Sequence, residues 1–148
     1  MSVELAWILG SLVSDGKYCY ETEIEYAVTD YNRIEKFIRC FKFCFGVEPR
    51  VNGPYQPKED NKLPYWCIRF GTKYLKDFFR ALGLKKGSWA GIKTIPEIMW
   101  TATKEECLSF LGGLWDGDGC GVTSYSSSSK HLLNGIQQML FMLEVVSK

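Results

Sequence analysis

The distribution of apolar residues predicts a buried helix at the start of the chain. Residues 3–14 are apolar on nearly every side, as in a helix covered all round, and Asp15-Gly16 ends it. Residues 17–28 alternate instead, which predicts a strand or hairpin. Its apolar face carries Thr22, Ile24, Tyr26 and Val28, and its solvent-exposed face carries Glu21, Glu23 and Glu25. Asp30 caps a second helix, expected over about 31–45 with a stripe of Ile and Phe residues.

The middle of the chain reads as a long β-hairpin followed by a helix. Residues 50–72 contain three prolines and a polar run, so the hairpin tip is expected near 56–63. Trp66, Ile68 and Phe70 face one side of its second strand, and Tyr65, Cys67 and Arg69 the other. An amphipathic helix over 73–84 and a connector over 85–103 follow. Thr103 and Glu106 form a capping box for the next helix, and a last helix is expected over about 129–143.

The chain contains an internal repeat. Ile8–Gly16 aligns without gaps onto Leu111–Gly119, at a spacing of 103 residues. In both copies an apolar helix carries a glycine five residues before an aspartate, and such small residues let two helices approach closely. If the two helices pair side by side, Asp15 and Asp118 emerge at the same end. Two carboxylates beside helix carbonyl ends favour a divalent cation.

Composition narrows the class of protein. The 148 residues are 46% hydrophobic and 15% aromatic, which suits one domain or two small repeats. No apolar run reaches the roughly 18 residues that span a bilayer, and the start has no basic segment typical of a secretory signal. We therefore expect an intracellular protein without membrane contact. The six cysteines form no C-x-x-C pair and are expected to be reduced and mostly buried.

Charge is concentrated in the middle third of the sequence. Residues 1–49 carry a net charge of −3, residues 50–93 of +7 and residues 94–148 of −3. Aromatic and amide side chains are interleaved with the basic ones, a mixture that suits phosphate contacts together with base-edge contacts. A solvated basic surface without a partner is the alternative that the charge pattern leaves open.

The repeated segments resemble the motifs of the LAGLIDADG homing endonuclease family, most closely the endonuclease domains carried inside inteins. The resemblance lies in Leu9–Gly16 and Phe110–Gly119, with support from Lys93-Thr94-Ile95-Pro96 and Tyr125–Lys130. It implies an α+β fold of two αββαββα repeats, with paired motif helices at their interface and a DNA-binding β-saddle. The first repeat with its connector would occupy residues 1–100, and a partial second repeat residues 101–148.

The resemblance also implies a site and a reaction. It predicts a site-specific double-strand DNA endonuclease in which Asp15 and Asp118 hold Mg²⁺ or Mn²⁺. The backbone carbonyls of Ser14 and Gly117 would complete the metal shell, and Lys93 would be the catalytic lysine. The partner is double-stranded DNA. The predicted DNA contacts are Lys17, Arg50, Asn52, Gln56, Lys58, Lys62, Tyr65, Arg69, Lys73 and Lys130.

Two departures from the family pattern lead to alternatives. Val13 stands where the family name has its first Asp, a position filled by Asp116 in the second motif. The sequence given stops soon after the last helix, so the second repeat has no basic hairpin. This predicts association or complementation through the second repeat and weak or absent cleavage by the 148 residues alone. The alternatives are a non-catalytic nucleic-acid-binding module and an inactive, truncated intein endonuclease. The given sequence has neither Cys nor Ser at position 1 and no terminal His-Asn pair, so we do not expect it to splice by itself.

Overall fold

The computed structural model describes residues 1–19, 23–59, 61–84, 92–120 and 124–145. Its first part runs helix–strand–strand–helix–strand–strand–helix: α1 (Val3–Asp15), β1 (Gly16–Cys19), β2 (Glu23–Val28), α2 (Tyr31–Phe45), β3 (Arg50–Tyr55), β4 (Tyr65–Phe70) and α3 (Lys73–Ala81). After a short 3-10 helix, η1 (Glu97–Thr101), the order begins again with α4 (Lys104–Asp118), β5 (Gly119–Cys120), β6 (Ser124–Tyr125) and α5 (Lys130–Met142). The described part of the second repeat thus ends after its second helix.

Side chains just before the helices explain where these elements begin. The residue before each of five helices accepts a hydrogen bond from a backbone N–H of the first turn, which satisfies a donor that the helix leaves free. These residues are Ser2, Asp30, Thr72, Thr103 and Ser129. Thr103 and Glu106 form the reciprocal capping box expected from the sequence.

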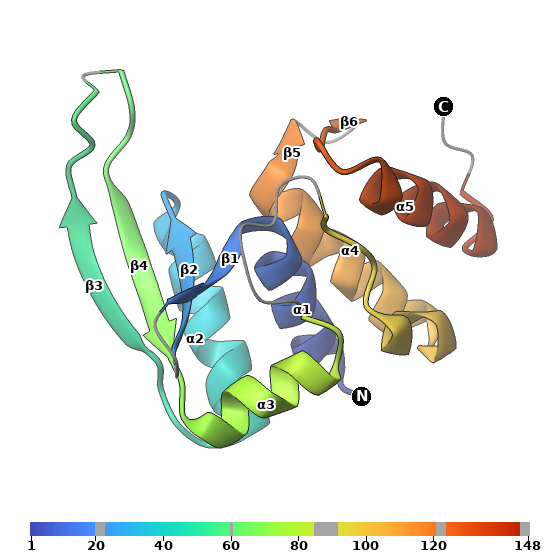
Figure 1. Cartoon of the computed structure of the whole chain (residues 1–148), viewed down its shortest axis with the longest axis horizontal. Helices are drawn as coiled ribbons and strands as arrows, with labels where there is room; N and C mark the ends of the chain where they lie inside the picture. The colour runs from blue at the N-terminus through green and yellow to red at the C-terminus, as the bar shows by residue number, and fades with distance from the viewer. Residues whose placement is uncertain (20–22, 60, 85–91, 121–123, 146–148) are drawn as a thin grey trace.

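The four strands of the first repeat form one antiparallel sheet in the order β1-β2-β4-β3 (Figure 1). Ile24, Tyr26 and Val28 of β2 are buried on the helix side, as the alternation predicts. The opposite face departs from the expectation, because Glu25 is only 3% exposed. Alternation shows which side of a sheet a residue occupies, but neighbouring strands decide whether that side is covered. Glu21 and Thr22 lie outside the described residues.

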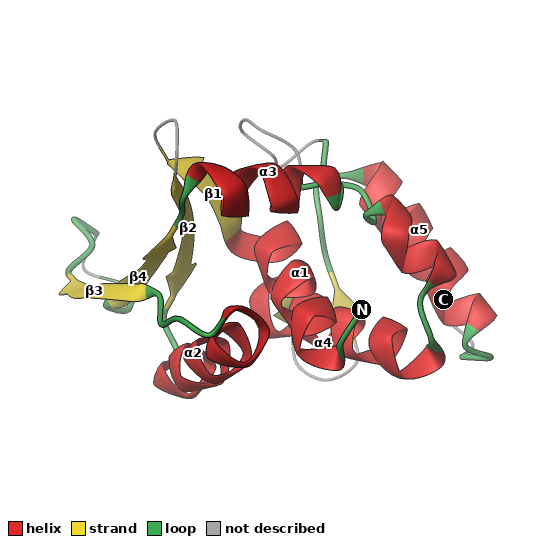
Figure 2. Cartoon of the chain, turned by 90° about the horizontal axis from the view of Figure 1, so that it is seen from below, coloured by secondary structure: helices red, strands yellow, loops and turns green. Residues whose placement is uncertain are grey.

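The two motif helices pack side by side in the centre of the molecule, with the sheet on one side and α5 on the other (Figures 1 and 2). Their contact depends on two glycines. A methyl group at Gly10 would overlap the backbone carbonyl of Phe110, and one at Gly113 would overlap the carbonyl of Trp7. Gly113 is the repeat equivalent of Gly10, and Phe110 is that of Trp7, each 103 residues further along the chain. The two contacts are therefore equivalent, and the repeats meet across an approximate two-fold axis.

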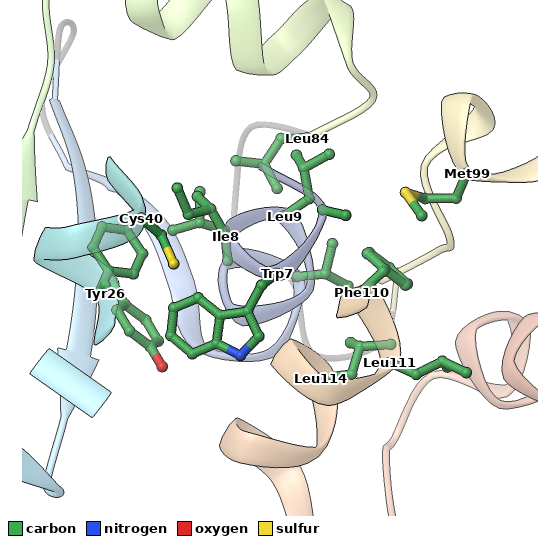
Figure 3. Packing of buried hydrophobic residues seen from close by; sticks show 14 of the residues in the cluster. Trp7, Ile8, Leu9, Tyr26, Cys40, Leu84, Met99, Phe110, Leu111 and Leu114 are labelled. Carbon is green, nitrogen blue, oxygen red and sulfur yellow. The ribbon is translucent and has the colours of Figure 1, made fainter. Parts of the chain in front are cut away.

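Apolar side chains surround this contact. Trp7, Ile8 and Leu9 of α1 and Phe110 and Leu114 of α4 are at most 2% exposed, and Ile8 lies on the side of Tyr26, away from Phe110 (Figure 3). The aromatic stripe of α2 continues the core toward the sheet: Phe41 packs against Phe70 of β4 at a centroid distance of 4.6 Å, with the rings tilted. The cluster of buried residues extends to the second repeat through Met99, Leu132, Ile136 and Met139.

Two large apolar side chains near the end of α5 are exposed. Phe141 is 83% and Met142 60% exposed, although the stripe below them is buried. Of the cysteines whose surroundings are described, five are free thiols, among them the buried Cys40, Cys67 and Cys107. No helix within the described residues combines the length and apolar character needed to cross a membrane.

The glycine contact can be tested with two neighbouring substitutions. Gly113→Ala should lower the free energy of unfolding by about 1–3 kcal/mol or more, because backbone atoms of α1 leave no room for a methyl group. Gly112→Ala is the matched control, since its methyl group would meet only the Trp7 side chain at 3.9 Å. Alanine is the better helix former, so this variant should match or exceed wild-type stability by up to about 1 kcal/mol. Equal urea midpoints for the two variants would contradict the close approach.

Candidate functional site

The C-terminal ends of α1 and α4 bring the two motif aspartates together. Asp15 is the last residue of α1 and Asp118 the last of α4, and each helix passes directly into a strand. Between them Gly117 has no side chain, and a Cβ there would lie 2.7 Å from Asp15 Oδ2 and would overlap the Ser14 hydroxyl. The glycine is therefore required for the two helix ends to meet. Ser14 and Gly117 occupy equivalent positions of the repeats and face each other.

Lys93 reaches the same place from the connector. Its Nζ donates to the backbone carbonyl of Ser14 and, at 3.2 Å, to Oδ2 of Asp118. Its side chain is 13% exposed, so the ammonium lies inside the site rather than on the outer surface. Lys93 thus ties a carbonyl of the first repeat to a carboxylate of the second. In this arrangement the Ser14 carbonyl, a predicted metal ligand, accepts from a protein donor.

Tyr125 belongs to the site, although the motif pattern alone assigns it no role. Its hydroxyl donates to Asp118 Oδ2 at 3.3 Å, and its ring packs on Trp115 at a centroid distance of 5.0 Å. Burial and the neighbouring Asp118 raise the pKa of the tyrosine. The short β5–β6 pairing sets Tyr125 opposite Gly119, next to Asp118. Only the fold of this hairpin reveals the contact.

The two carboxylates differ in their surroundings. Asp118 accepts from Lys93 and Tyr125, whereas Asp15 has no hydrogen-bond or ion-pair partner among the described residues. Burial, followed by repulsion from Asp118, raises the pKa of Asp15 to about 6, although Lys93 and Arg33 act in the opposite direction. Repulsion between the two carboxylates thus adds to the cost of burying Asp15.

This donor set fits a hard divalent cation. Carboxylate and carbonyl oxygens are the ligands that Mg²⁺ and Mn²⁺ prefer, and a cation would relieve the repulsion that raises the pKa of Asp15. Within the described residues no group of three or more His, Cys, Asp or Glu side chains could hold a metal. A metal would therefore depend on two carboxylates, backbone carbonyls, water and a substrate.

The second feature of interest is the sheet face that points away from the helices. β3 is exposed along its whole length, and β3 and β4 extend as a ribbon beyond the other strands (Figure 1). Arg50, Asn52, Gln56, Lys58 and Lys62 are exposed on this ribbon, and Tyr65 stacks against Tyr55 at 5.6 Å. The predicted polar contacts are thus gathered along one hairpin, at the opposite end of the molecule from α5.

Two other predicted DNA contacts lie elsewhere. Lys73 is exposed at the start of α3, and Lys130 is exposed at the start of α5. The described structure does not bring either into the ribbon strands. Arg69 lies on the sheet face opposite Ile68 and Phe70, as the strand alternation predicts, but it is only partly exposed because it pairs with Glu25. Cys67 on that same face is buried.

Comparison with known proteins identifies relatives of the fold. Residues 105–148 match the family described as LAGLIDADG-like domain. A mesophilic variant of the homing endonuclease I-DmoI has a TM-score of 0.68 at 16% identity, over 99% of this chain and 76% of that one. I-DmoI in complex with DNA and Mn gives 0.64 at 17% identity, over 95% and 77%. I-WcaI bound to its DNA recognition sequence gives 0.57 at 14% identity, over 95% and 66%.

The sequence also matches part of a protein that is named as an aminotransferase. The glutamine–fructose-6-phosphate aminotransferase (isomerizing) of Methanocaldococcus jannaschii is 24% identical over 116 residues. The match covers 78% of this chain and 10% of that protein, so the chain spans about a tenth of the relative's length. The structural likenesses confirm the predicted fold class and the resemblance read from the two motifs, with an incomplete second repeat.

The pKa of Asp15 generates a test on the metal-free protein. The unfolded carboxyl loses its proton near 3.8 and the folded one near 6, so stability should fall as the pH rises through this window. At pH 7.5, in the presence of a chelator, the free energy of unfolding of Asp15→Asn should therefore exceed that of wild type by about 1–3 kcal/mol, as measured by urea denaturation. At pH 3.5 the difference should disappear. Asp77→Asn, at an exposed carboxylate of α3, is the control and should show no such dependence.

Proposed function

We propose that this chain, which has the fold of the LAGLIDADG homing endonucleases, cleaves double-stranded DNA at a specific site with a divalent cation. The observation that carries the proposal is the meeting of Asp15, Asp118 and Lys93 at the ends of the paired helices. Structures of I-DmoI were solved in complex with DNA and with Mn, Mg or Ca, which supports a similar partner and metal here.

The residues of the site have separate roles in this proposal. Asp15 and Asp118 would hold Mg²⁺ or Mn²⁺, with help from the carbonyls of Ser14 and Gly117. A cation bound there supplies activation of the attacking water and neutralisation of charge on the phosphate. Lys93 adds a fixed positive charge beside the scissile phosphate, and its buried position spares the cost of ordering it during the reaction. Tyr125 is a positioning residue, since it holds one oxygen of Asp118.

DNA recognition would depend on the β3–β4 ribbon. Its width as a two-stranded ribbon suits the major groove, and its arginine, asparagine and glutamine side chains can donate and accept at base edges. Lys58 and Lys62 would add phosphate contacts. Within the described residues, only the first repeat has such a ribbon.

An origin inside another protein is part of the proposal. The aminotransferase match is confined to a tenth of a protein whose name concerns different chemistry. A match confined to one segment of such an enzyme is what an intein-borne endonuclease domain within it would give. We infer the same kind of origin for this chain.

A non-catalytic DNA-binding module on the same scaffold is the main rival. Such a module would have no need for two carboxylates that repel each other at a shared helix junction. Keeping them costs stability, as the raised pKa of Asp15 indicates. The burial of Lys93 beside Asp118 likewise has no purpose in a module that binds only through its ribbon. These two features favour the endonuclease.

The proposal is tested with DNA binding and cleavage measured on the same variants. A library of randomised duplexes is incubated with the chain and Mg²⁺ or Mn²⁺, and the cut ends are sequenced. Wild type should yield a recurrent cut site, and Asp118→Asn should lose cleavage by at least about a hundredfold while it still binds the selected duplex. Asp116→Asn, at a neighbouring half-buried carboxylate, keeps an oxygen acceptor for the Trp7 indole N–H, so it is the control and should keep cleavage. Unimpaired cutting by Asp118→Asn would refute the metal site.

Tyr125 offers a graded test of the same site. Tyr125→Phe removes the hydrogen bond to Asp118 but keeps the ring on Trp115, so folding should be unaffected. A less restrained carboxylate should bind Mn²⁺ about three- to tenfold more weakly, with DNA affinity unchanged. Mn²⁺ binding is measured by electron paramagnetic resonance of the free ion. Trp115→Phe, which keeps the hydroxyl, serves as control; unchanged Mn²⁺ affinity in Tyr125→Phe would remove Tyr125 from the site.

A further inference from the structure

A row of charges crosses the four-stranded sheet on its outer face. The strand register pairs Lys17 of β1 with Glu25 of β2, Glu25 with Arg69 of β4, and Arg69 with Arg50 of β3. Residues paired in this way share one face of a sheet. The row therefore reads positive, negative, positive, positive from one edge to the other, with Glu25 on a central strand.

Glu25 lies underneath the cations of this row. Its side chain is 4% exposed, whereas that of Lys17 is 58% and that of Arg69 32% exposed. Lys17 Nζ lies 2.7 Å from Glu25 Oε1, and Arg69 Nε lies 2.7 Å from Oε2. Each carboxylate oxygen thus holds one cation. Burial alone would raise the pKa of Glu25, but the bonds to Lys17 and Arg69 outweigh it and keep that pKa below its ordinary value.

These residues surround an open hollow on the proposed DNA-binding face. The hollow has a volume of about 450 Å³ and is lined by Lys17, Cys19, Glu25, Tyr55, Tyr65, Cys67 and Arg69. Two arginines directly opposite each other, as Arg50 and Arg69 are, disfavour the sheet. Apolar residues could replace a buried ion pair with little loss of stability. A purely structural role therefore does not explain why charge is concentrated here.

We propose that Glu25 is a positioning residue for DNA readout, which fixes Arg69 and Lys17 so that they donate to base edges instead of binding phosphates. Arg69 uses its Nε for Glu25, and its two terminal nitrogens remain as donors for a guanine. A guanidinium already held in place also loses less side-chain entropy on binding. The inference rests on the proposed DNA-binding function.

The charge balance gives this role a second consequence. Glu25 offsets one of the two cations that it holds, so the three residues together carry +1. A cation that is already paired releases fewer counterions when DNA binds. Glu25 should therefore reduce affinity for arbitrary DNA while it increases discrimination between sequences.

The experiment compares Glu25→Gln with Glu23→Gln. Glu23 lies two residues away on the same face and pairs with Arg50, whose side chain is 67% exposed, so both variants lose one negative charge. Two probes are used: a fluorescent duplex of arbitrary sequence, titrated at several salt concentrations, and a randomised duplex library, whose bound fraction is sequenced. Circular dichroism and urea unfolding verify that both variants fold.

The expected results differ between the variants. Glu25→Gln should bind the arbitrary duplex more tightly, and the slope of log affinity against log salt concentration should become steeper by about 1–2. Its discrimination between sequences should fall by about tenfold or more. Glu23→Gln should gain similar affinity but retain discrimination. If Glu25→Gln retains discrimination as well, the carboxylate acts through charge alone and the proposal is overturned.

A second pair of variants decides the question if Glu25→Gln does not fold. Lys17→Gln leaves the Glu25–Arg69 pair intact but removes one positive charge, so it should weaken sequence preference and also lower the salt dependence by about 1. Lys58→Gln, whose side chain has no ion-pair partner among the described residues, should lower the salt dependence by about 1 and keep the preference. Equal effects of Lys17→Gln and Lys58→Gln on sequence preference would overturn the proposal. If wild type binds neither probe, the proposed function itself fails, and with it this inference.

Discussion

The structure depends on how closely α1 and α4 approach each other. Gly10 and Gly113 each lie against a backbone carbonyl of the opposite helix, with no space for a side chain. At this distance the last residues of both helices necessarily meet, and a third glycine, Gly117, keeps their junction open. The position of Asp15 relative to Asp118 is therefore fixed by the backbone, and long flexible side chains do not have to provide it.

This arrangement divides the molecule into a rigid centre and two unequal flanks. On one side a sheet and two helices carry the β3–β4 ribbon, and on the other side α5 packs on η1 without a described sheet of comparable size. Lys93 and Tyr125 reach the centre from the second flank and contact Asp118. The chemistry of the site is consequently asymmetric, although the helices that build it are related by an approximate two-fold axis.

Much of this architecture could be predicted from the sequence because its determinants are local or repeated. Cap residues such as Asp30 and Thr103 mark helix starts, and a repeat at a spacing of 103 residues pairs the two motifs. Glu25 and Tyr125 could not be understood in this way. Glu25 is buried because Lys17 and Arg69 close over it from two other strands, and Tyr125 contacts Asp118 because a two-residue strand pairing turns it back. Such contacts depend on how strands align with one another, and the hydrophobic periodicity of a single segment does not specify that alignment.

The polar contact at Trp7 is made in one direction only, from α1 to α4, so the two motif helices are not interchangeable. Trp7 is 2% exposed, and its indole N–H donates to Asp116 at 2.9 Å, while Lys36 lies 3.5 Å from the same carboxylate oxygen. By the repeat spacing, the residue that corresponds to Asp116 in the first motif is Val13. If α1 paired with a second α1, each buried indole N–H would meet a valine and lose its acceptor, which costs more than the bond itself contributes. A single hydrogen bond thus favours the union of unlike halves over self-pairing, so that the two halves are free to diverge in sequence.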